Sequence, residues 1–351
     1  MVSRRTALQS VGALLGGFSA GCIGQSGPTS DRVQWQRQIR GTPLLDDGTL
    51  YILDRLTLYA LSPTDGSGQW TVAYDEDEFD ERLCLHGELA VDERRIYVSA
   101  FDGLRALRRS DGEQSWSIGS PLRSGVTVNG GRVYANSDDL LAIDADGGEI
   151  DWRVSTDGEH LTKPAATEDI VVFTNRVDGV VTAFDTDGEQ RWTHHTDTET
   201  RSPTVADETV YVATAPVPGR QGRLLALDIE NGGVQWNVET PSLKRGTRPV
   251  VGTEAIYLGC NGRDSERLVA RNQQDGSERW LFTSDNRSMC EPVVDEGTAY
   301  AGSNDNTLYA FSLTGEAKWT VETDSTVGSV AVGEEFVYTS NNERLFAVER
   351  R

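Results

Sequence analysis

The chain has 351 residues, enough for one large domain or two ordinary ones, and its 55 acidic residues outnumber 33 basic ones to give a net charge of −22. So acidic a surface repels phosphates, which excludes nucleic acid as a partner. Only three of the basic residues are lysines, and an acidic, lysine-poor surface stays soluble where salt screens its self-repulsion, so we expect an extremely halophilic source.

Residues 1–22 predict an export signal. Arg4 and Arg5 precede about fifteen weakly apolar residues, too few for a stable membrane span, and then Ser19-Ala20-Gly21-Cys22. The paired arginines resemble a twin-arginine signal, and Ser19–Cys22 resembles a lipobox that makes Cys22 the lipid-modified first residue. We expect a lipoprotein on the outer face of the cytoplasmic membrane, with residues 23–32 as a flexible tether. A plain cleaved signal is the alternative.

From residue 33 onward the chain repeats one pattern. In each copy from Trp70 onward, a glycine stands four residues before the tryptophan and an alanine nine or ten residues before it. Further upstream lie two short β-rich strands, the second centred on an aromatic residue; in the fourth copy the spacing between them is one residue longer and leads to Phe173. The repeated tryptophans are Trp35, Trp70, Trp116, Trp152, Trp192, Trp236, Trp280 and Trp319.

These repeats predict a ring of four-stranded blades. A unit of about 40 residues with four short strands and Gly/Asp/Asn turns is typical of a β-propeller blade. Seven copies are complete, whereas the eighth, from about residue 325, offers three strands before Arg351. The segment around Trp35 has no strands before it, so we expect this N-terminal strand to complete the eighth blade. The prediction is an all-β, eight-bladed propeller of antiparallel blades over residues 33–351, and a monomer.

We expect the tryptophans to hold blades together rather than to bind a cofactor. Glycine with Asn or Asp supplies the left-handed backbone of a tight turn between the third and fourth strands. The tryptophan that follows then packs between adjacent blades. Burying a ring of that size stabilises the fold by about 2–3 kcal/mol.

The pattern A-x-D-x-x-x-G-x-x-x-W, as in Ala226-Leu227-Asp228 with Gly232 and Trp236, resembles the docking motif of PQQ-like propellers. That family includes quinoprotein alcohol and glucose dehydrogenases and also lipid-anchored, non-catalytic BamB-like propellers. The dehydrogenases hold PQQ beside adjacent cysteines and Ca²⁺ with Glu, Asn and Asp. This chain has no adjacent cysteine pair and no recognisable Glu–Asn–Asp set.

The resemblance therefore implies a non-enzymatic, exported, membrane-anchored scaffold for protein or ligand interaction, without a cofactor. A small PQQ- and Ca²⁺-dependent dehydrogenase acting on alcohols or sugars is the alternative. A binding module for surface polysaccharide is a third possibility.

Basic residues gather just before the first strands of blades 3 to 6. In a propeller, the loops that enter the innermost strands share one face with the loops between second and third strands. We therefore expect a basic mouth over the central channel that binds an anionic ligand or an acidic segment of a protein partner. Ordinary loop charges that balance nearby acids are the alternative. The set is Arg123, Lys163, Arg201 and Arg248, flanked by Glu88 and Glu291.

The cysteines and histidines suggest no metal centre. Cys260 ends the second strand of blade 6 and Cys290 begins the first strand of blade 7, on the same face. Either a disulfide between them or two buried thiols fits an exported protein. His194 and His195 alternate along a strand, so they do not easily bind one metal, and we expect no catalytic histidine. We interpret the acidic run 75–82 as a solvated connection between blades.

Overall fold

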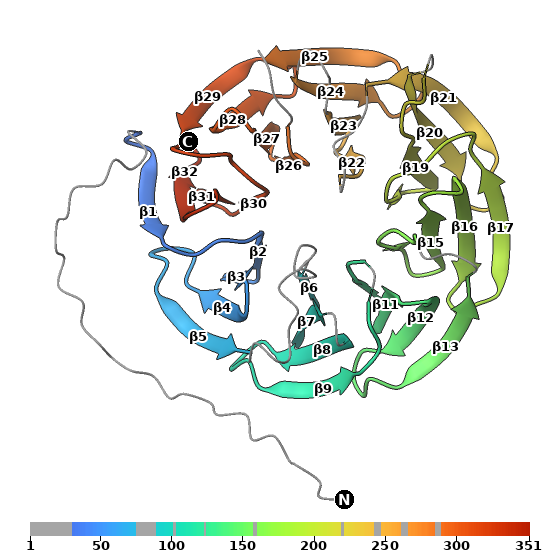
Figure 1. Cartoon of the computed structure of the whole chain (residues 1–351). Helices are drawn as coiled ribbons and strands as arrows, with labels where there is room; N and C mark the ends of the chain where they lie inside the picture. Colours follow the sequence, from blue (N-terminus) through green and yellow to red (C-terminus); the bar gives the residue numbers. More distant parts are fainter. Residues whose placement is uncertain are drawn as a thin grey trace, which may run out of the picture.

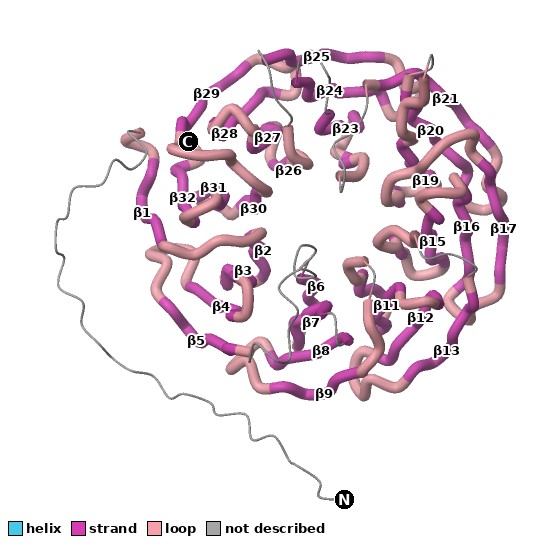
Figure 2. The backbone as a smooth tube through the Cα atoms, viewed as in Figure 1, coloured by secondary structure: helices cyan, strands magenta, loops and turns pink. Residues whose placement is uncertain are grey.

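The computed structural model of the chain is a ring of eight four-stranded antiparallel blades (Figure 1). It describes residues 30–74, 89–100, 103–122, 124–156, 160–218, 221–241, 247–260, 266–284 and 289–351. Strands joined by turns account for the regular structure within these ranges, which contain no helix (Figure 2). The predicted fold is confirmed. The export signal and the acidic run 75–82 lie outside the described residues.

The strands of the first four blades run in chain order from the innermost strand to the outer one. Blade 1 comprises β2 (Pro43–Asp46), β3 (Thr49–Asp54), β4 (Thr57–Leu61) and β5 (Gly68–Ala73). Blade 2 comprises β6 (Leu89–Val91), β7 (Arg95–Ala100), β8 (Gly103–Arg108) and β9 (Gln114–Ile118). Blade 3 comprises β10 (Thr127–Asn129), β11 (Arg132–Asn136), β12 (Asp139–Asp144) and β13 (Ile150–Ser155). Blade 4 comprises β14 (Ala165–Ala166), β15 (Ile170–Asn175), β16 (Val180–Asp185) and β17 (Gln190–His195).

The remaining blades follow the same order, except that the last one takes its outer strand from the start of the chain. Blade 5 comprises β18 (Thr204–Ala206), β19 (Thr209–Ala213), β20 (Gly222–Asp228) and β21 (Val234–Thr240). Blade 6 comprises β22 (Val250–Val251), β23 (Ala255–Cys260), β24 (Glu266–Asn272) and β25 (Glu278–Ser284). Blade 7 comprises β26 (Val293–Asp295), β27 (Thr298–Gly302), β28 (Thr307–Ser312) and β29 (Ala317–Glu322). Blade 8 comprises β30 (Val330–Val332), β31 (Phe336–Ser340), β32 (Leu345–Glu349) and β1 (Val33–Arg37).

The N-terminal strand closes the ring. β1 pairs antiparallel with β32, and Trp35 lies opposite Ala347. Backbone bonds extend the pairing beyond the strand, because the amide of Glu349 donates to the carbonyl of Arg32 at 2.8 Å. Val33 packs against the apolar cluster shared by blades 7 and 8. Pairing β1 in this way removes the free edge that β32 would otherwise expose.

Each blade is built around a fully buried alanine on its third strand. In blade 5, Ala226 pairs with Tyr211 on one side and Trp236 on the other, and the two ring centroids are 6.0 Å apart. A larger residue than alanine would have to displace one of these rings. Blade 4 differs, because Ala183 pairs with Val172 and not with Phe173. Phe173 follows one residue later, as the longer spacing of this copy indicates, and its ring stacks on Phe184.

Every tryptophan reaches across to the next blade. Trp70 donates its indole N–H to the carbonyl of Arg109 in blade 2 at 2.8 Å. The turn glycine of blade 2 lies directly on the same ring, since a Cβ added to Gly112 would stand 2.7 Å from Trp70. The eight indole bonds, 2.7–3.2 Å long, run in the same direction around the ring, and the last one joins Trp319 to the carbonyl of Arg350.

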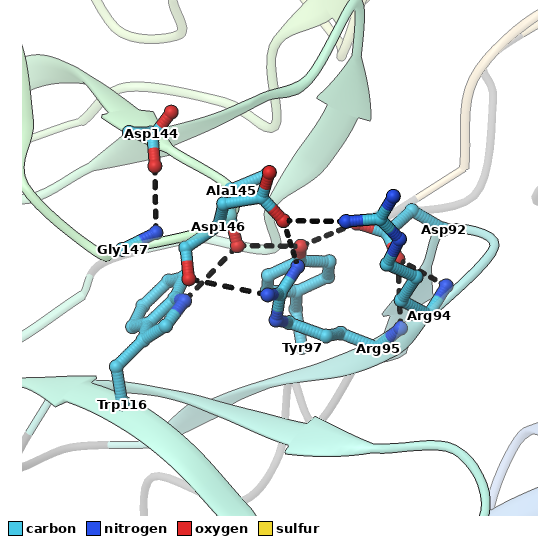
Figure 3. A network of polar contacts seen from close by, with 9 residues as sticks. All are labelled: Asp92, Arg94, Arg95, Tyr97, Trp116, Asp144, Ala145, Asp146 and Gly147. Carbon is cyan, nitrogen blue, oxygen red and sulfur yellow. Dashed lines mark hydrogen bonds and ion pairs between the residues drawn. The ribbon is translucent and has the colours of Figure 1, made fainter.

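Charged side chains reinforce the junction of blades 2 and 3 (Figure 3). The hydroxyl of Tyr97 donates to Asp92 at 2.5 Å and lies 3.3 Å from the carbonyl of Ala145. Arg95 binds Asp146 through the carboxylate at 2.8 Å and through the backbone carbonyl at 3.2 Å. Burial, together with Asp92, raises the pKa of Tyr97, whereas Arg95 lowers the pKa of Asp146. The junction is therefore held by the neutral phenol of Tyr97 and the ionised carboxylate of Asp146.

Candidate functional site

Three charged side chains gather where blades 4 and 5 meet, on the face that carries the loops between second and third strands; we call this the linker face. Glu199 lies between two arginines: its Oε2 is 3.6 Å from Nη1 of Arg176 and 3.7 Å from Nη1 of Arg201. The Arg201 side chain is only 8% exposed, whereas that of Arg176 is 34% exposed. One carboxylate is thus shared by two guanidinium groups.

Backbone hydrogen bonds fix the segment that carries Glu199 and Arg201. The amide of Thr200 donates to the carbonyl of Arg176 at 3.0 Å, which ties the segment to the β15–β16 loop. On the other side, the amide of Arg201 donates to the carbonyl of Ala213 at 2.8 Å, and the amide of Ala215 donates to the carbonyl of Glu199 at 2.7 Å. The three charges are therefore positioned by two neighbouring blades before any partner arrives.

Two exposed valines lie on the loops that hold this cluster. Val177, next to Arg176, is 45% exposed, and Val217, two residues beyond Ala215, is 37% exposed. Arginine is enriched at surfaces that contact other proteins, and exposed apolar side chains add to such contacts where they gather in a patch. We define the blade 4–5 loop cluster as Arg176, Val177, Glu199, Arg201 and Val217.

The structure changes the interpretation of the expected basic mouth. Arg201 is buried rather than presented to a ligand, because the two loops enclose it. Arg248 and Glu291 come together: Nε of Arg248 is 3.3 Å from Oε1 of Glu291, and its backbone amide donates to Oε2 at 3.2 Å. Glu291 therefore offsets the charge of Arg248. Lys163 is half-buried just before β14.

The remaining members of the expected set, Arg123 and Glu88, lie outside the described residues, as do Arg4, Arg5, Cys22 and Cys84. Sequence reasoning missed Arg176 and Glu199. The β15–β16 loop was a signal for Arg176, because that loop shares the linker face with the segment that enters β18.

Cys260 and Cys290 are buried thiols in the structure and are not joined by a disulfide. Their backbones come close, since the amide of Met289 donates to the carbonyl of Cys260 at 3.4 Å. The side chains diverge, however. Cys260 packs in the apolar cluster between blades 5 and 6, whereas Sγ of Cys290 lies 3.6 Å from the carbonyl of Val327 in blade 8. Of the two states expected from the sequence, the structure has the pair of thiols.

Within the described ranges, no three His, Cys, Asp or Glu side chains gather in a way that could hold a metal ion. The same ranges contain no helix of the length and apolarity needed to cross a membrane.

Comparison with known proteins connects the chain to one family. The family model described as outer membrane protein assembly factor BamB matches residues 20–119, 100–256 and 245–351. BamB of Yersinia pestis is 27% identical over 214 residues, which are 55% of this chain and 51% of that protein. The dehydrogenase subunit of a quinone-dependent alcohol dehydrogenase from Gluconacetobacter polyoxogenes is 25% identical over 71% of this chain and 34% of its own length.

A solved structure gives the same picture at the level of fold. The crystal structure of BamB from Moraxella catarrhalis superposes with a TM-score of 0.68 at 20% identity and covers 93% of this chain and 97% of that one. The chain spans only about half of the length of the first curated relatives that it matches. Because the family model nonetheless matches nearly all of the repeat region, the chain belongs to the family described as outer membrane protein assembly factor BamB, whose fold is the PQQ-like propeller.

Proposed function

We propose that the protein is a non-enzymatic scaffold that binds another protein through the blade 4–5 loop cluster. The observation that carries this proposal is the pairing of two exposed valines with the Arg176–Glu199–Arg201 cluster on loops that the backbone already holds in place. Arginine is one of the residues enriched at energetically important contacts between proteins. The partly exposed guanidinium of Arg176, on a chain of charge −22, favours an acidic segment of the partner.

We further propose that the predicted export signal directs this scaffold to the outside of the cytoplasmic membrane. There a lipid on Cys22 would anchor it. Replacing Cys22 with serine should release the protein from membranes after export, and intact mass should show the loss of the lipid. A chain that stays on membranes with serine at this position would remove the anchor from the proposal without affecting the scaffold.

Photo-crosslinking in the native membrane tests the scaffold. A crosslinking amino acid at Val177 or Val217 should give a discrete protein adduct, and Arg176→Glu should abolish it. Ile150 is the matched control, because it is an equally exposed aliphatic residue at the start of outer strand β13, away from the cluster. The same adducts at Ile150, or none at either valine, would contradict the proposal.

The dehydrogenase alternative is tested separately. We would titrate the purified chain with PQQ and Ca²⁺ in high salt and follow the absorbance of the quinone and the melting temperature, which a ligand bound only by the folded state must raise. No saturable change is expected. A saturable change followed by dye-linked oxidation of an alcohol or a sugar would replace the scaffold with an enzyme.

A further inference from the structure

A groove with a volume of about 450 Å³ lies on the outer wall of the ring between blades 4 and 5. One wall is the end of β17 with His194 and His195, and the other comes from β20 and β21. β17 and β21 are the outer strands of their blades (Figure 1). The groove adjoins the blade 4–5 loop cluster, because its lining residues Thr198 and Thr214 precede Glu199 and Ala215 in the chain, but it is lined by none of the cluster's own residues. Its volume falls within the range of sites that hold small ligands, roughly 300–1,000 Å³.

The lining offers many hydrogen-bonding groups and little net charge. It contains one guanidinium group, from Arg223, and two carboxylates, from Asp197 and Glu239. The other polar groups are amides such as that of Asn237, hydroxyls of threonines and the two imidazoles. Burial lowers the pKa of His194, so this ring stays neutral at pH 7. Donors and acceptors therefore stand side by side without a dominant charge.

Internal contacts hold two of these groups in place. Nε of Arg223 donates to Oδ1 of Asn237 at 2.5 Å, and Nη2 donates to the backbone carbonyl of Asn237 at 3.2 Å. The backbone amide of Arg223 in turn donates to Oγ1 of Thr214 at 3.1 Å. Two planar polar groups, a guanidinium and an amide, are thus fixed against each other across β20 and β21. Little side-chain entropy remains to be lost when a ligand binds them.

Apolar contact is available but limited. Leu225 and Val234 contribute the only aliphatic side chains among the residues that line the groove, and Val234 is 49% exposed. This is too little apolar surface for a hydrophobic ligand or an amphipathic helix. Two carboxylates against one guanidinium also disfavour an anion, and no metal-binding set exists among the described residues.

We propose that this groove binds a neutral oligosaccharide. Sugar hydroxyls donate and accept hydrogen bonds in pairs, which suits an amide, a guanidinium and carboxylates held at fixed positions. The C–H faces of a sugar ring require only modest apolar contact, which the exposed Val234 provides, since Leu225 is 4% exposed. This site goes beyond the scaffold function and does not depend on it.

The test uses the purified full chain in detergent and neutral trisaccharides built from glucose, mannose, galactose or N-acetylglucosamine. Saturation-transfer NMR identifies a binding sugar, and calorimetry measures its Kd. At least one trisaccharide should bind saturably, and Asn237→Ala and Glu239→Ala should each weaken binding about three- to tenfold, the effect of one lost hydrogen bond. Both residues are exposed on β21, so the variants should fold.

Gln235→Ala is the matched control, because Gln235 lies on the same strand two residues before Asn237 and does not line the groove. It should leave the Kd unchanged. The proposal is overturned if no trisaccharide binds, if Asn237→Ala and Glu239→Ala leave the Kd unchanged, or if an extended peptide paired to the edge of β17 displaces the sugar. Crosslinking from Val177 should be indifferent to Asn237→Ala, so the failure of one proposal can be told from the failure of the other.

Discussion

Two arginines show how single residues fasten neighbouring blades. Arg109 and Arg350 stand where the backbone carbonyl accepts the indole of the preceding blade, and their side chains turn back to a tyrosine of that blade. Nε of Arg109 is 3.3 Å from the hydroxyl of Tyr51, and Nε of Arg350 is 3.0 Å from the hydroxyl of Tyr300. One residue thus holds the preceding blade through both its backbone and its side chain.

Replacing Arg350 with alanine should lower the free energy of unfolding by about 2–4 kcal/mol. The change leaves its buried hydrogen-bond partners, the hydroxyl of Tyr300 and the carbonyl of Gly333, without the guanidinium. The side chain is 6% exposed and also binds Asp295 and the carbonyl of Gly333, the latter at 2.8 Å. Urea unfolding of the variant measures the loss. Arg153→Ala, which breaks an exposed ion pair, should cost about 0.5 kcal/mol or less. Equal losses of unfolding free energy in the two variants would contradict the role of Arg350 in joining blades 7 and 8.

Buried tyrosines should make the protein sensitive to alkali. Tyr338 donates to the carbonyl of Pro63 at 3.0 Å, and burial, with a smaller effect of Glu335, raises its pKa to about 12. An unfolded tyrosine ionises near about pH 10, so the folded chain holds the extra proton between these values. This stabilisation is complete below about pH 10 and is lost as the pH rises through about 12.

Urea midpoints measured from pH 9 to pH 12 should fall, and they should fall less steeply in Tyr338→Phe, which has no proton to lose at this position. The variant also loses the hydrogen bond to Pro63, which lowers its stability at every pH. The change in the slope of the urea midpoint against pH is therefore the result that tests the pKa of Tyr338. Parallel pH profiles of the two proteins would show that Tyr338 titrates normally.

At the scale of elements, the outer strands differ in their origin but not in their packing. β1 carries Trp35, which donates to the carbonyl of Pro63 at 3.0 Å as the other tryptophans do to their neighbours. Its pairing with β32 even shows the register shift beside the tryptophan that the other blades show. An element from the start of the chain therefore occupies a place fully equivalent to that of β5 or β21.

Deleting residues 1–37 should leave β32 as an open edge, lower the melting temperature and promote association. A peptide of residues 30–42 added in trans should restore the melting temperature. The same peptide with Trp35→Ala is the control and should restore little, because the docking ring is missing. Full stability without β1 would mean that the seam contributes little to the ring.

At the scale of the whole molecule, the repeat explains why the sequence predicts so much of the fold. Each Ala–Trp pair from Trp70 onward recurs with its glycine, so seven weak signals support one register, and the missing strand of blade 8 points to β1. Blade 4 is the exception in register: Val172 lies opposite Ala183, and the aromatic Phe173 follows one residue later, which the longer spacing of this copy indicates.

The candidate site lacks such repetition and was predicted only in part. The loops of the linker face were expected to share a face, but the burial of Arg201 and the pairing of Arg248 with Glu291 depend on how neighbouring blades approach each other. The groove beside Asn237 combines residues from three strands of two blades without any motif. Contacts between blades decide both sites, and they leave no local pattern in the sequence.

The pairing of β1 with β32 also determines when the ring can close during biosynthesis. Arg32 and Glu349, which meet there, are 317 residues apart in the sequence, so the first strand to leave the ribosome waits for the last one. Such distant pairing is slow, and the unfinished ring exposes strand edges until it forms. A signal of the predicted twin-arginine type, which exports folded chains, would keep this waiting period inside the cell and let only closed rings cross the membrane.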